Sequence, residues 1–302
     1  MSYDIEPSPN LPEHSLIQKA VRRGNVELVE KVFNYLINID GQQHWLKNRL
    51  AVIGYEECWQ YANTLNFTCN DYELLKQYKA FACKVKNKDC DGLAYLANRV
   101  NDWEKTALRG DTKQKEGIQR VADAMKNDTK FWNWIENQPL YDLNKQRIEA
   151  AREAMKRVWQ DRAIMFAAAY LSVTHPIPPV EEIEPNNNNT NFQYWTAIDK
   201  HTTEGTEIIR LASENIGLLP KRGQFLTFYF AGALCNKVQD MPFFKLMKEY
   251  KIERMGYTCE KVKTIWRKLR PQIIKMSKLE VEAMIKRINT VKKNLSEPGL
   301  FD

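Results

Sequence analysis

Residues 15–41, SLIQKAVRRGNVELVEKVFNYLINIDG, set a pattern that most of the chain repeats. Apolar side chains recur three and four positions apart over 16–21 and again over 26–37, which is the period of an α-helix. Gly24 interrupts the pattern between the two runs, and Gly41 ends the second. The stretch therefore predicts a helical hairpin with its turn at Gly24.

Apolar stripes of the same period continue to the end of the chain. Glycine and proline are scarce, at 12 each in 302 residues, and no stretch alternates as a strand would. The stripes predict helices over 45–61, 72–84, 91–100, 192–199, 202–216, 224–238, 241–255, 259–268 and 277–294, and one long helix over 141–173. We therefore expect an all-α fold, a multi-helix orthogonal array of two helical lobes.

A polar interruption separates the two expected lobes. Prolines at 176, 178 and 179 stop the long helix, and four consecutive asparagines follow at 187–190. Such proline-rich and low-complexity stretches are typical of linkers. We therefore expect an N-terminal lobe at 1–176, a linker at 177–191 and a C-terminal lobe at 192–302.

Positive charge concentrates in the C-terminal lobe. Residues 245–293 hold fifteen Lys and Arg against five Glu, a local net charge of +10 in a chain whose total is +7. A basic lobe on a near-neutral body is the pattern expected for a nucleic-acid partner. A lysine-rich, solvated helix surface is the alternative.

Other features exclude several classes of protein. The six cysteines form no CxxC pair, and four scattered histidines give no zinc spacing, so we expect neither a metal nor a cofactor. No run approaches the ~18 apolar residues that cross a bilayer. The acidic, proline-containing start has neither the charged nor the apolar region of a signal peptide. We expect a cytoplasmic protein with no membrane partner.

The hairpin and the segment after it resemble a known family. In order and spacing, residues 15–57 resemble the C-terminal helical domain of RarA/MgsA-type recombination ATPases, relatives of clamp loaders, which carries an R-L-x-x-I-A-S-E-D-x-G pattern. The positions that fit are Arg49, Leu50, Ile53 and Glu56, while Gly54 and Tyr55 depart from it. Residues 210–217, RLASENIG, match the residues of this pattern more fully, but they do not lie at the place in the chain where the family has it. No G-x-x-x-x-G-K-[ST] occurs, so the resemblance implies the helical scaffold without the ATPase module.

Residues 219–227, LPKRGQFLT, resemble the helix–hairpin–helix element of base-excision DNA glycosylases, whose hairpin reads L-P-x-x-G before a helix. Lys221 replaces the first hairpin glycine. A tight glycine turn lets backbone N–H groups at the helix start approach a DNA phosphate. The resemblance implies DNA contacts by Lys221, Arg222 and Gly223. In that family a catalytic aspartate follows the next helix, and Asp240 lies at about that spacing from the hairpin. An ordinary helix–turn–helix joint is the alternative.

The densest polar cluster is DKHTTE at 199–204. Breaking an N-glycosidic bond builds positive charge on the sugar, which a nearby carboxylate stabilises. Asp199 is the first candidate for this role and Asp240 the second. His201 or Lys200 would protonate or hydrogen-bond the leaving base, with Glu204 completing the cluster. The same residues also fit a helix cap with Thr203 at the N-cap position.

Aromatic and basic side chains are the candidates for holding the nucleic acid. Tyr194 and Trp195 precede the polar cluster and would stack a base flipped out of the duplex. The basic residues expected to contact the phosphate backbone are Lys261, Lys263, Arg267, Lys268 and Arg270. The final residues include Leu300-Phe301, which resembles peptides that hold sliding clamps, with a frayed terminus as the alternative.

Two hypotheses follow from the sequence. The first is a DNA glycosylase that excises a modified or damaged base, in repair or in anti-phage defence. The second is a non-enzymatic DNA-binding scaffold of replication or recombination, related to the RarA-type proteins. The polar cluster at 199–204 favours the enzyme narrowly.

Overall fold

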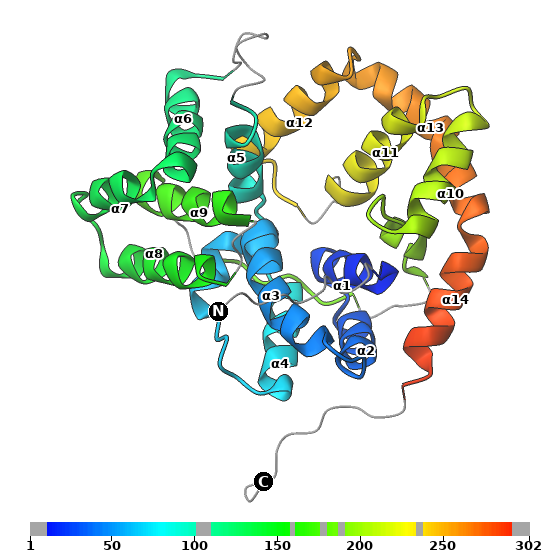
Figure 1. The fold of residues 1–302 in the computed structure, drawn as a ribbon, viewed down its shortest axis with the longest axis horizontal. Helices are drawn as coiled ribbons and strands as arrows, with labels where there is room; N and C mark the ends of the chain where they lie inside the picture. Colours follow the sequence, from blue (N-terminus) through cyan, green and yellow to red (C-terminus); the bar gives the residue numbers. More distant parts are fainter. Residues whose placement is uncertain are drawn as a thin grey trace, which may run out of the picture.

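The fold is all-α, as the sequence predicts. A computed structural model describes residues 11–100, 110–157, 161–175, 180–186, 191–233 and 238–291, except for the side chains of 232 and 233. These residues form fourteen α-helices, and the only β pairing among them is three isolated bridges. The helices surround α1, which lies near the centre of the molecule in Figure 1.

The helices have the following bounds. They are α1 (Pro12–Arg22), α2 (Val26–Ile37), α3 (Gln42–Cys58), α4 (Asp71–Ala82), α5 (Asp89–Ala97), α6 (Thr112–Lys126), α7 (Asp128–Glu136), α8 (Asp142–Met155), α9 (Arg162–Thr174), α10 (Thr203–Glu214), α11 (Pro220–Thr227), α12 (Pro242–Arg254), α13 (Cys259–Met276) and α14 (Lys278–Asn289). Shorter segments include the 3₁₀ helices η1 (Trp59–Thr64) and η5 (Tyr194–Ala197) and the π-helical η6 (Phe228–Ala233).

The predicted N-terminal hairpin is confirmed as α1 and α2. Gly24 takes a φ of 69°, a left-handed conformation that glycine adopts without steric cost, and so turns the chain. Asn25 then starts α2 as its N-cap, because its side-chain oxygen accepts a hydrogen bond from the N–H of Leu28 at 2.9 Å. The apolar stripes of both helices are completely buried except at Val26 and Ile37, the two ends of α2, which are partly buried.

Three hydrophobic clusters form the core, and they do not follow the predicted lobes. The first contains side chains from the five helices α5 through α9 and from α12, which contributes Phe243 and Phe244. The second joins α1 to α4 with α14, through Met284 and Ile288. The third lies among α10, α11 and α13. The clusters cross the predicted division at 177–191, because α12 and α14 each pack into a cluster built mainly by the first 176 residues.

The predicted linker is also bound to the body in the part that the structure describes. Residues 180–186 run beside the end of α4, where Ile183 N–H donates to the Cys83 carbonyl at 2.8 Å and Val85 N–H donates to the Glu181 carbonyl at 3.0 Å. The proline run at 176–179 and the asparagines at 187–190 lie outside the described residues.

Several predicted helices have different bounds. The long helix over 141–173 is wrong: α8 ends at Met155 and α9 starts at Arg162, so that the two helices pack against each other. The helix predicted at 192–199 is only the short η5. The one predicted at 224–238 starts earlier, as α11, and continues as the π-helical η6.

The helix predicted to end at Lys268 continues to Met276 as α13, with Pro271 inside it. Proline in a helix interior costs about 3 kcal/mol. Leu269 and Ile273, on either side of it, are both completely buried in the third cluster. Burying these two side chains offsets the cost of the missing N–H.

A close crossing of α5 and α12 fixes α12 beside the centre of the fold. A Cβ on Gly92 would stand 2.5 Å from the backbone nitrogen of Phe244, so only glycine permits this approach. Asp89, almost fully buried, accepts hydrogen bonds from the N–H groups of Phe243 at 2.6 Å and Phe244 at 3.0 Å. It thereby caps the first turn of α12.

Candidate functional site

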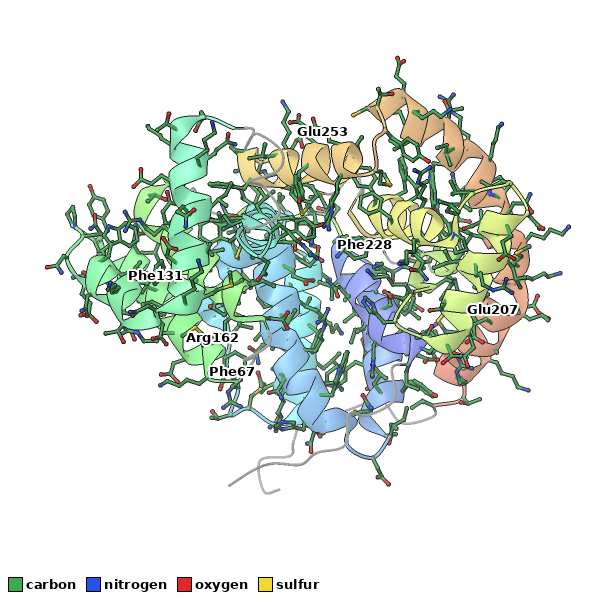
Figure 2. The ribbon with its side chains drawn as sticks, turned by 45° about the horizontal axis from the view of Figure 1, so that its top comes forward. Phe67, Phe131, Arg162, Glu207, Phe228 and Glu253 are labelled. Atoms are coloured by element: carbon green, nitrogen blue, oxygen red, sulfur yellow. The ribbon has the colours of Figure 1, made fainter. Side chains whose placement is uncertain are left out.

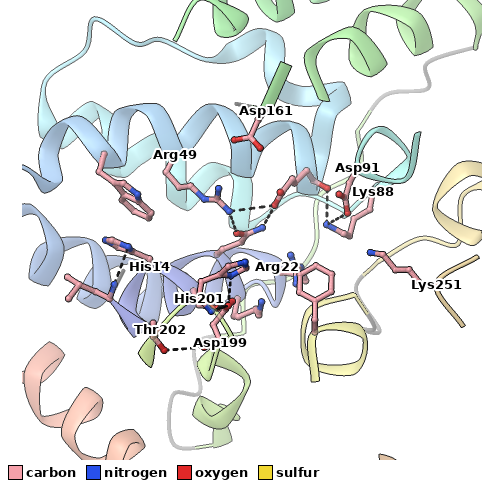
Figure 3. Close-up of a pocket in the computed structure, with 17 residues that line it drawn as sticks. His14, Arg22, Arg49, Lys88, Asp91, Asp161, Asp199, His201, Thr202 and Lys251 are labelled. Atoms are coloured by element: carbon pink, nitrogen blue, oxygen red, sulfur yellow. Dashed lines mark hydrogen bonds and ion pairs between the residues drawn. The ribbon is translucent and has the colours of Figure 1, made fainter. Parts of the chain in front are cut away.

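A polar cavity of about 540 Å³ lies beside α1, where residues far apart in the sequence meet (Figure 3). It is lined by Leu11, His14, Ser15, Gln18, Lys19 and Arg22 of the first helical region, Trp45, Arg49 and Glu56 of α3, Lys88 and Asp91 around α5, Asp161 before α9, and Asp199, His201, Thr202, Phe228 and Lys251. Most of these side chains are charged or polar, which makes the cavity a candidate for recognising a polar ligand.

One face of α1 supplies most of one wall. Its lining residues lie on the face opposite the apolar stripe that builds the second cluster. Buried charge is therefore concentrated on this helix, because Lys19 and Arg22 are 7% and 3% exposed. Figure 3 shows Asp199 and His201 on one side of the cavity and Asp161, Arg49 and Asp91 on the other.

Asp199 is the best-held carboxylate of the predicted cluster. It follows η5, and the backbone N–H of His201 donates to its Oδ1 at 2.9 Å. The Nδ1 of His201 lies 2.5 Å from the same oxygen, and the Ser15 hydroxyl donates to Oδ2 at 3.4 Å. The side chain of Asp199 is 19% exposed, whereas that of His201 is 61% exposed. The carboxylate is thus held inside the cavity, and the imidazole lies at its solvent side.

These contacts keep Asp199 ionised. Burial acts to raise its pKa, but the hydrogen bond to His201 and the charge of Lys19 outweigh burial and hold the pKa below its usual range. Thr202 fixes the backbone that follows, since its hydroxyl donates to the Asp199 carbonyl at 3.1 Å and accepts from Gly205 N–H at 3.0 Å. Thr202, and not Thr203 as the capping alternative has it, is therefore the N-cap of α10.

A buried ion-pair network supports the wall behind Lys19. Glu57 is completely buried, and both of its oxygens accept from Arg22 Nε, at 3.0 and 2.8 Å. Lys88 Nζ lies 3.4 Å from Glu57 and 3.0 Å from Asp91. Burial would raise the pKa of Glu57, but its cationic partners hold it far below the usual range. The network fixes α1, α3 and the start of α5 against one another.

The cavity also contains carboxyls of the opposite character. Burial raises the pKa of Glu56, which contacts Gln18 and lies 3.9 Å from Arg49. Burial raises the pKa of Asp161 as well. One cavity therefore combines a carboxylate held ionised with carboxyls that bind a proton more readily, an arrangement typical of acid–base sites.

Aromatic side chains stand at two ends of the cavity. The imidazole of His14 stacks on Trp45, with ring centroids 3.7 Å apart, and its Nε2 lies 2.7 Å from the side-chain oxygen of Gln42. Phe228, at the start of η6, is 40% exposed and lies near the N-terminal helices in Figure 2. The ammonium of Lys251 lies 4.8 Å from its ring centroid.

Three predicted catalytic residues lie away from this cavity. Asp240 is 59% exposed and pairs with Lys248 at 2.5 Å, outside the lining. Lys200 points to the Phe228 ring at 5.4 Å and lines only a much smaller neighbouring space. Glu204 lies exposed in the first turn of α10. The structure thus groups Asp199 and His201 and separates them from the others.

The predicted stacking residues also lie outside the lining. Trp195 is 9% exposed and packs in the third cluster, with Trp266 at 5.9 Å and the Arg270 guanidinium at 5.4 Å. Tyr194 packs edge-on against Phe192 beside the second cluster. Trp195 therefore fills the core, and Tyr194 packs half-buried beside it, because their short segment η5 lies between clusters.

The glycine turn predicted at Lys221–Gly223 is wrong. Pro220 starts α11, so Gly223 lies inside this helix, and the turn occurs earlier, at Gly217, where φ is 67°. A Cβ on Gly223 would lie 1.8 Å from the Ser213 hydroxyl, so the glycine serves the close crossing of α10 and α11. Lys221 and Arg222 are exposed on the first turn of α11, and Arg222 donates to the Tyr257 hydroxyl at 2.7 Å.

The predicted basic surface is concentrated on α13. This helix contains a single acidic residue, Glu260, and six exposed cations: Lys261, Lys263, Arg267, Lys268, Arg270 and Lys275. None of the six forms an ion pair with a described carboxylate. By contrast, Lys248 pairs with Asp240 and Arg287 with Glu13, so the cations of α12 and α14 contribute less free charge.

Sequence reasoning missed most of the cavity. Lys19, Glu56 and Lys251 belong to helices whose other residues gave ordinary amphipathic patterns. The sequence held one signal of this burial. Lys19 and Arg22 are close neighbours of the apolar residues of the hairpin, and both side chains are buried. Their three-dimensional partners lie up to 232 positions away, at Lys251.

Within the described part of the chain, no three His, Cys, Asp or Glu side chains gather as a metal site. No helix among the described residues combines the length and the apolar character needed to cross a membrane. Leu300-Phe301 lies outside the described residues. No family model, curated protein or solved structure matches this chain.

Proposed function

We propose that the protein is a DNA glycosylase that excises a modified or damaged base. The observation that carries the proposal is the presence, in one cavity, of the ionised Asp199 and of Glu56, whose pKa is raised by burial. Cleavage of an N-glycosidic bond needs both kinds of group, one to stabilise the cationic sugar and one to protonate the departing base.

Asp199 is the group suited to the sugar. Its carboxylate stays charged inside a cavity that is partly shielded from water, where its attraction for a developing cation is stronger than in solvent. His201 contacts Asp199 and keeps its orientation. Glu56 supplies the proton to the leaving base, because burial raises its pKa toward the working pH.

The cavity favours a base that carries a polar substituent. Its volume of about 540 Å³ lies within the usual range of small-molecule pockets and exceeds what a single planar ring requires. Trp45 and Phe228 provide aromatic surface for the ring. Gln18 and Arg49, which hydrogen-bond each other at 2.7 Å, line the cavity and offer polar contacts to a substituent.

The duplex would be held by the unpaired cations of α13. Removing one of these cations eliminates a phosphate contact, so binding weakens similarly for all sequences. The scaffold hypothesis uses the same surface, but it gives no role to the buried charges of the cavity. For this reason the enzyme is the better-supported function.

The test is base excision by Asp199→Asn and by a matched control, Asp240→Asn. Duplexes with enlarged polar bases, with oxidised or alkylated bases, and with normal bases are incubated with each protein and then treated with alkali. We expect wild-type protein and Asp240→Asn to cleave a modified duplex equally, and Asp199→Asn to be slower by at least ~100-fold. Absence of excision from every duplex, or full activity of Asp199→Asn, would refute the proposal.

DNA binding is tested separately with a triple variant, Lys263→Gln, Arg267→Gln and Arg270→Gln. The matched control removes Lys115, Lys126 and Lys130, which lie at the opposite end of the molecule on α6 and in α7 (Figure 1). We expect the α13 variant to reduce the slope of log K against log salt by about 0.9 for each phosphate that the helix no longer neutralises. Identical slopes for both triple variants would show that α13 is not the DNA-binding surface.

A further inference from the structure

Helix α1 supplies two buried cations to the cavity wall, Lys19 and Arg22, and they differ in their contacts. The side chain of Lys19 is 7% exposed and lines both the main cavity and the small space beside Asp199 and Phe228. Its Nζ makes no hydrogen bond or ion pair with any described residue, whereas Arg22, one turn later, is bidentate to Glu57. A buried amine that reaches a cavity and binds none of the described side chains has no structural role that these contacts reveal.

The amine of Lys19 is also available in its neutral form. Burial, together with the charge of Arg22, lowers its pKa to about 7, so about half of the molecules carry an uncharged amine at neutral pH. Burial also lowers the pKa of Lys251, the other lysine without an ion pair in the described lining, but only to about 8. Its Nζ lies 4.0 Å from the Tyr95 ring centroid and 4.8 Å from that of Phe228, contacts that favour the ammonium form, so less of its amine is neutral at pH 7 than that of Lys19.

A neutral, buried amine is the group that attacks carbonyl carbons to form Schiff bases. Base excision creates such a carbonyl, because the abasic sugar opens to an aldehyde at C1′. We infer that the protein is also an abasic-site lyase in which Lys19 is the nucleophile. The inference rests on the proposed function only in assuming that the same cavity receives the sugar.

The reaction begins when the Lys19 nitrogen adds to C1′ of the aldehyde, and the adduct loses water to give an iminium ion. The C2′ hydrogen then leaves as a proton to solvent, its electron pair forms the C2′–C3′ double bond, and the C3′–O bond breaks, so that the 3′ phosphate departs with the downstream strand. Water finally hydrolyses the imine and regenerates the amine. Asp199, whose negative charge acts on Lys19, stabilises the cationic iminium.

The test uses a duplex with a preformed abasic site, so that no base excision is required. With sodium borohydride present, we expect wild-type protein to form a covalent protein–DNA adduct, and peptide mapping to place the adduct on Lys19. Without borohydride, the strand is expected to break with no alkali treatment. Lys19→Met should lose at least ~100-fold of both signals, while Lys31→Gln, an exposed lysine on α2 paired with Glu27, should keep both.

Absence of an adduct from wild-type protein, or an adduct mapped to Lys251 or another residue, would overturn the inference. The mapping uses wild-type protein, so it does not depend on whether a variant folds. The two functions are separable in the same samples. Alkali-dependent cleavage of a modified duplex without any adduct refutes the lyase alone, and an adduct on Lys19 without excision of any base refutes the glycosylase alone.

Discussion

Replacing Lys19 by methionine should stabilise the protein, and the gain should depend on pH. Methionine has a similar length and no charge, so it fills the same buried position without an ammonium group. Burial lowers the pKa of Lys19 from its usual 10.5 to about 7. The charged form is therefore disfavoured in the folded state, although Asp199 and Glu57 act in the opposite direction.

The size of the effect follows from the two pKa values. The folded value lies below the unfolded one, so the penalty is fully present below about pH 7 and disappears as pH rises through 10.5. At 1.36 kcal/mol for each unit, the penalty is about 5 kcal/mol at pH 6 and about 2 kcal/mol at pH 9. The stability advantage of Lys19→Met over wild-type protein should therefore shrink by about 3 kcal/mol between these pH values.

Urea denaturation of both proteins at pH 6 and pH 9, followed by circular dichroism, measures this difference. Titrating groups that are not coupled to Lys19 affect both proteins alike and cancel, as does any constant change in packing. Lys31→Gln, on the exposed face of α2, provides a control whose difference from wild type should not change with pH. An advantage of equal size at both pH values would show that Lys19 is not a strained, buried ammonium in the folded protein.

Three further predictions concern the framework around the cavity. Glu57→Gln should cost about 3–5 kcal/mol in the free energy of unfolding at pH 7, because it removes the buried carboxylate that Arg22 and Lys88 share, and the loss should narrow as pH falls through the usual carboxyl range. Gly92→Ala should cost about 3 kcal/mol, since its Cβ would meet the Phe244 backbone; a change under 0.5 kcal/mol would contradict the crossing. Arg287→Ala should destabilise by about 2 kcal/mol by leaving the buried Glu13 carboxylate without its 2.7 Å partner, whereas Arg287→Lys should recover part of this in the same urea titration.

Much of the fold could be predicted from local pattern. The hairpin of α1 and α2 follows from an apolar period of 3.6 and a glycine that takes a positive φ. The predicted helix boundaries were wrong where tertiary packing determines the end of the helix. Pro271 should have ended α13, but buried neighbours on both sides keep the helix continuous. Packing across the predicted lobes was missed for a similar reason, because chain order does not reveal that α12 packs on α5.

The site was only partly predictable. Asp199 and His201 stand two residues apart, so the sequence alone brought them together. Lys19 and Glu56 acquire their properties from burial, which depends on helices that meet only in the folded chain. Trp195 illustrates the opposite error, since an aromatic beside a polar cluster suggested a ligand contact but fills the core.

The cavity joins α1 to segments more than 170 positions further along the chain, and α14 closes on α1 through Arg287 and Glu13. A nascent polypeptide emerging from the ribosome therefore has Lys19 in place long before Asp199, Phe228 and Lys251 exist. Prematurely terminated fragments that lack these later residues cannot assemble the pocket. Any chemistry that the pocket performs is thereby withheld from truncated copies, which is a useful property in a protein proposed to cut genetic material.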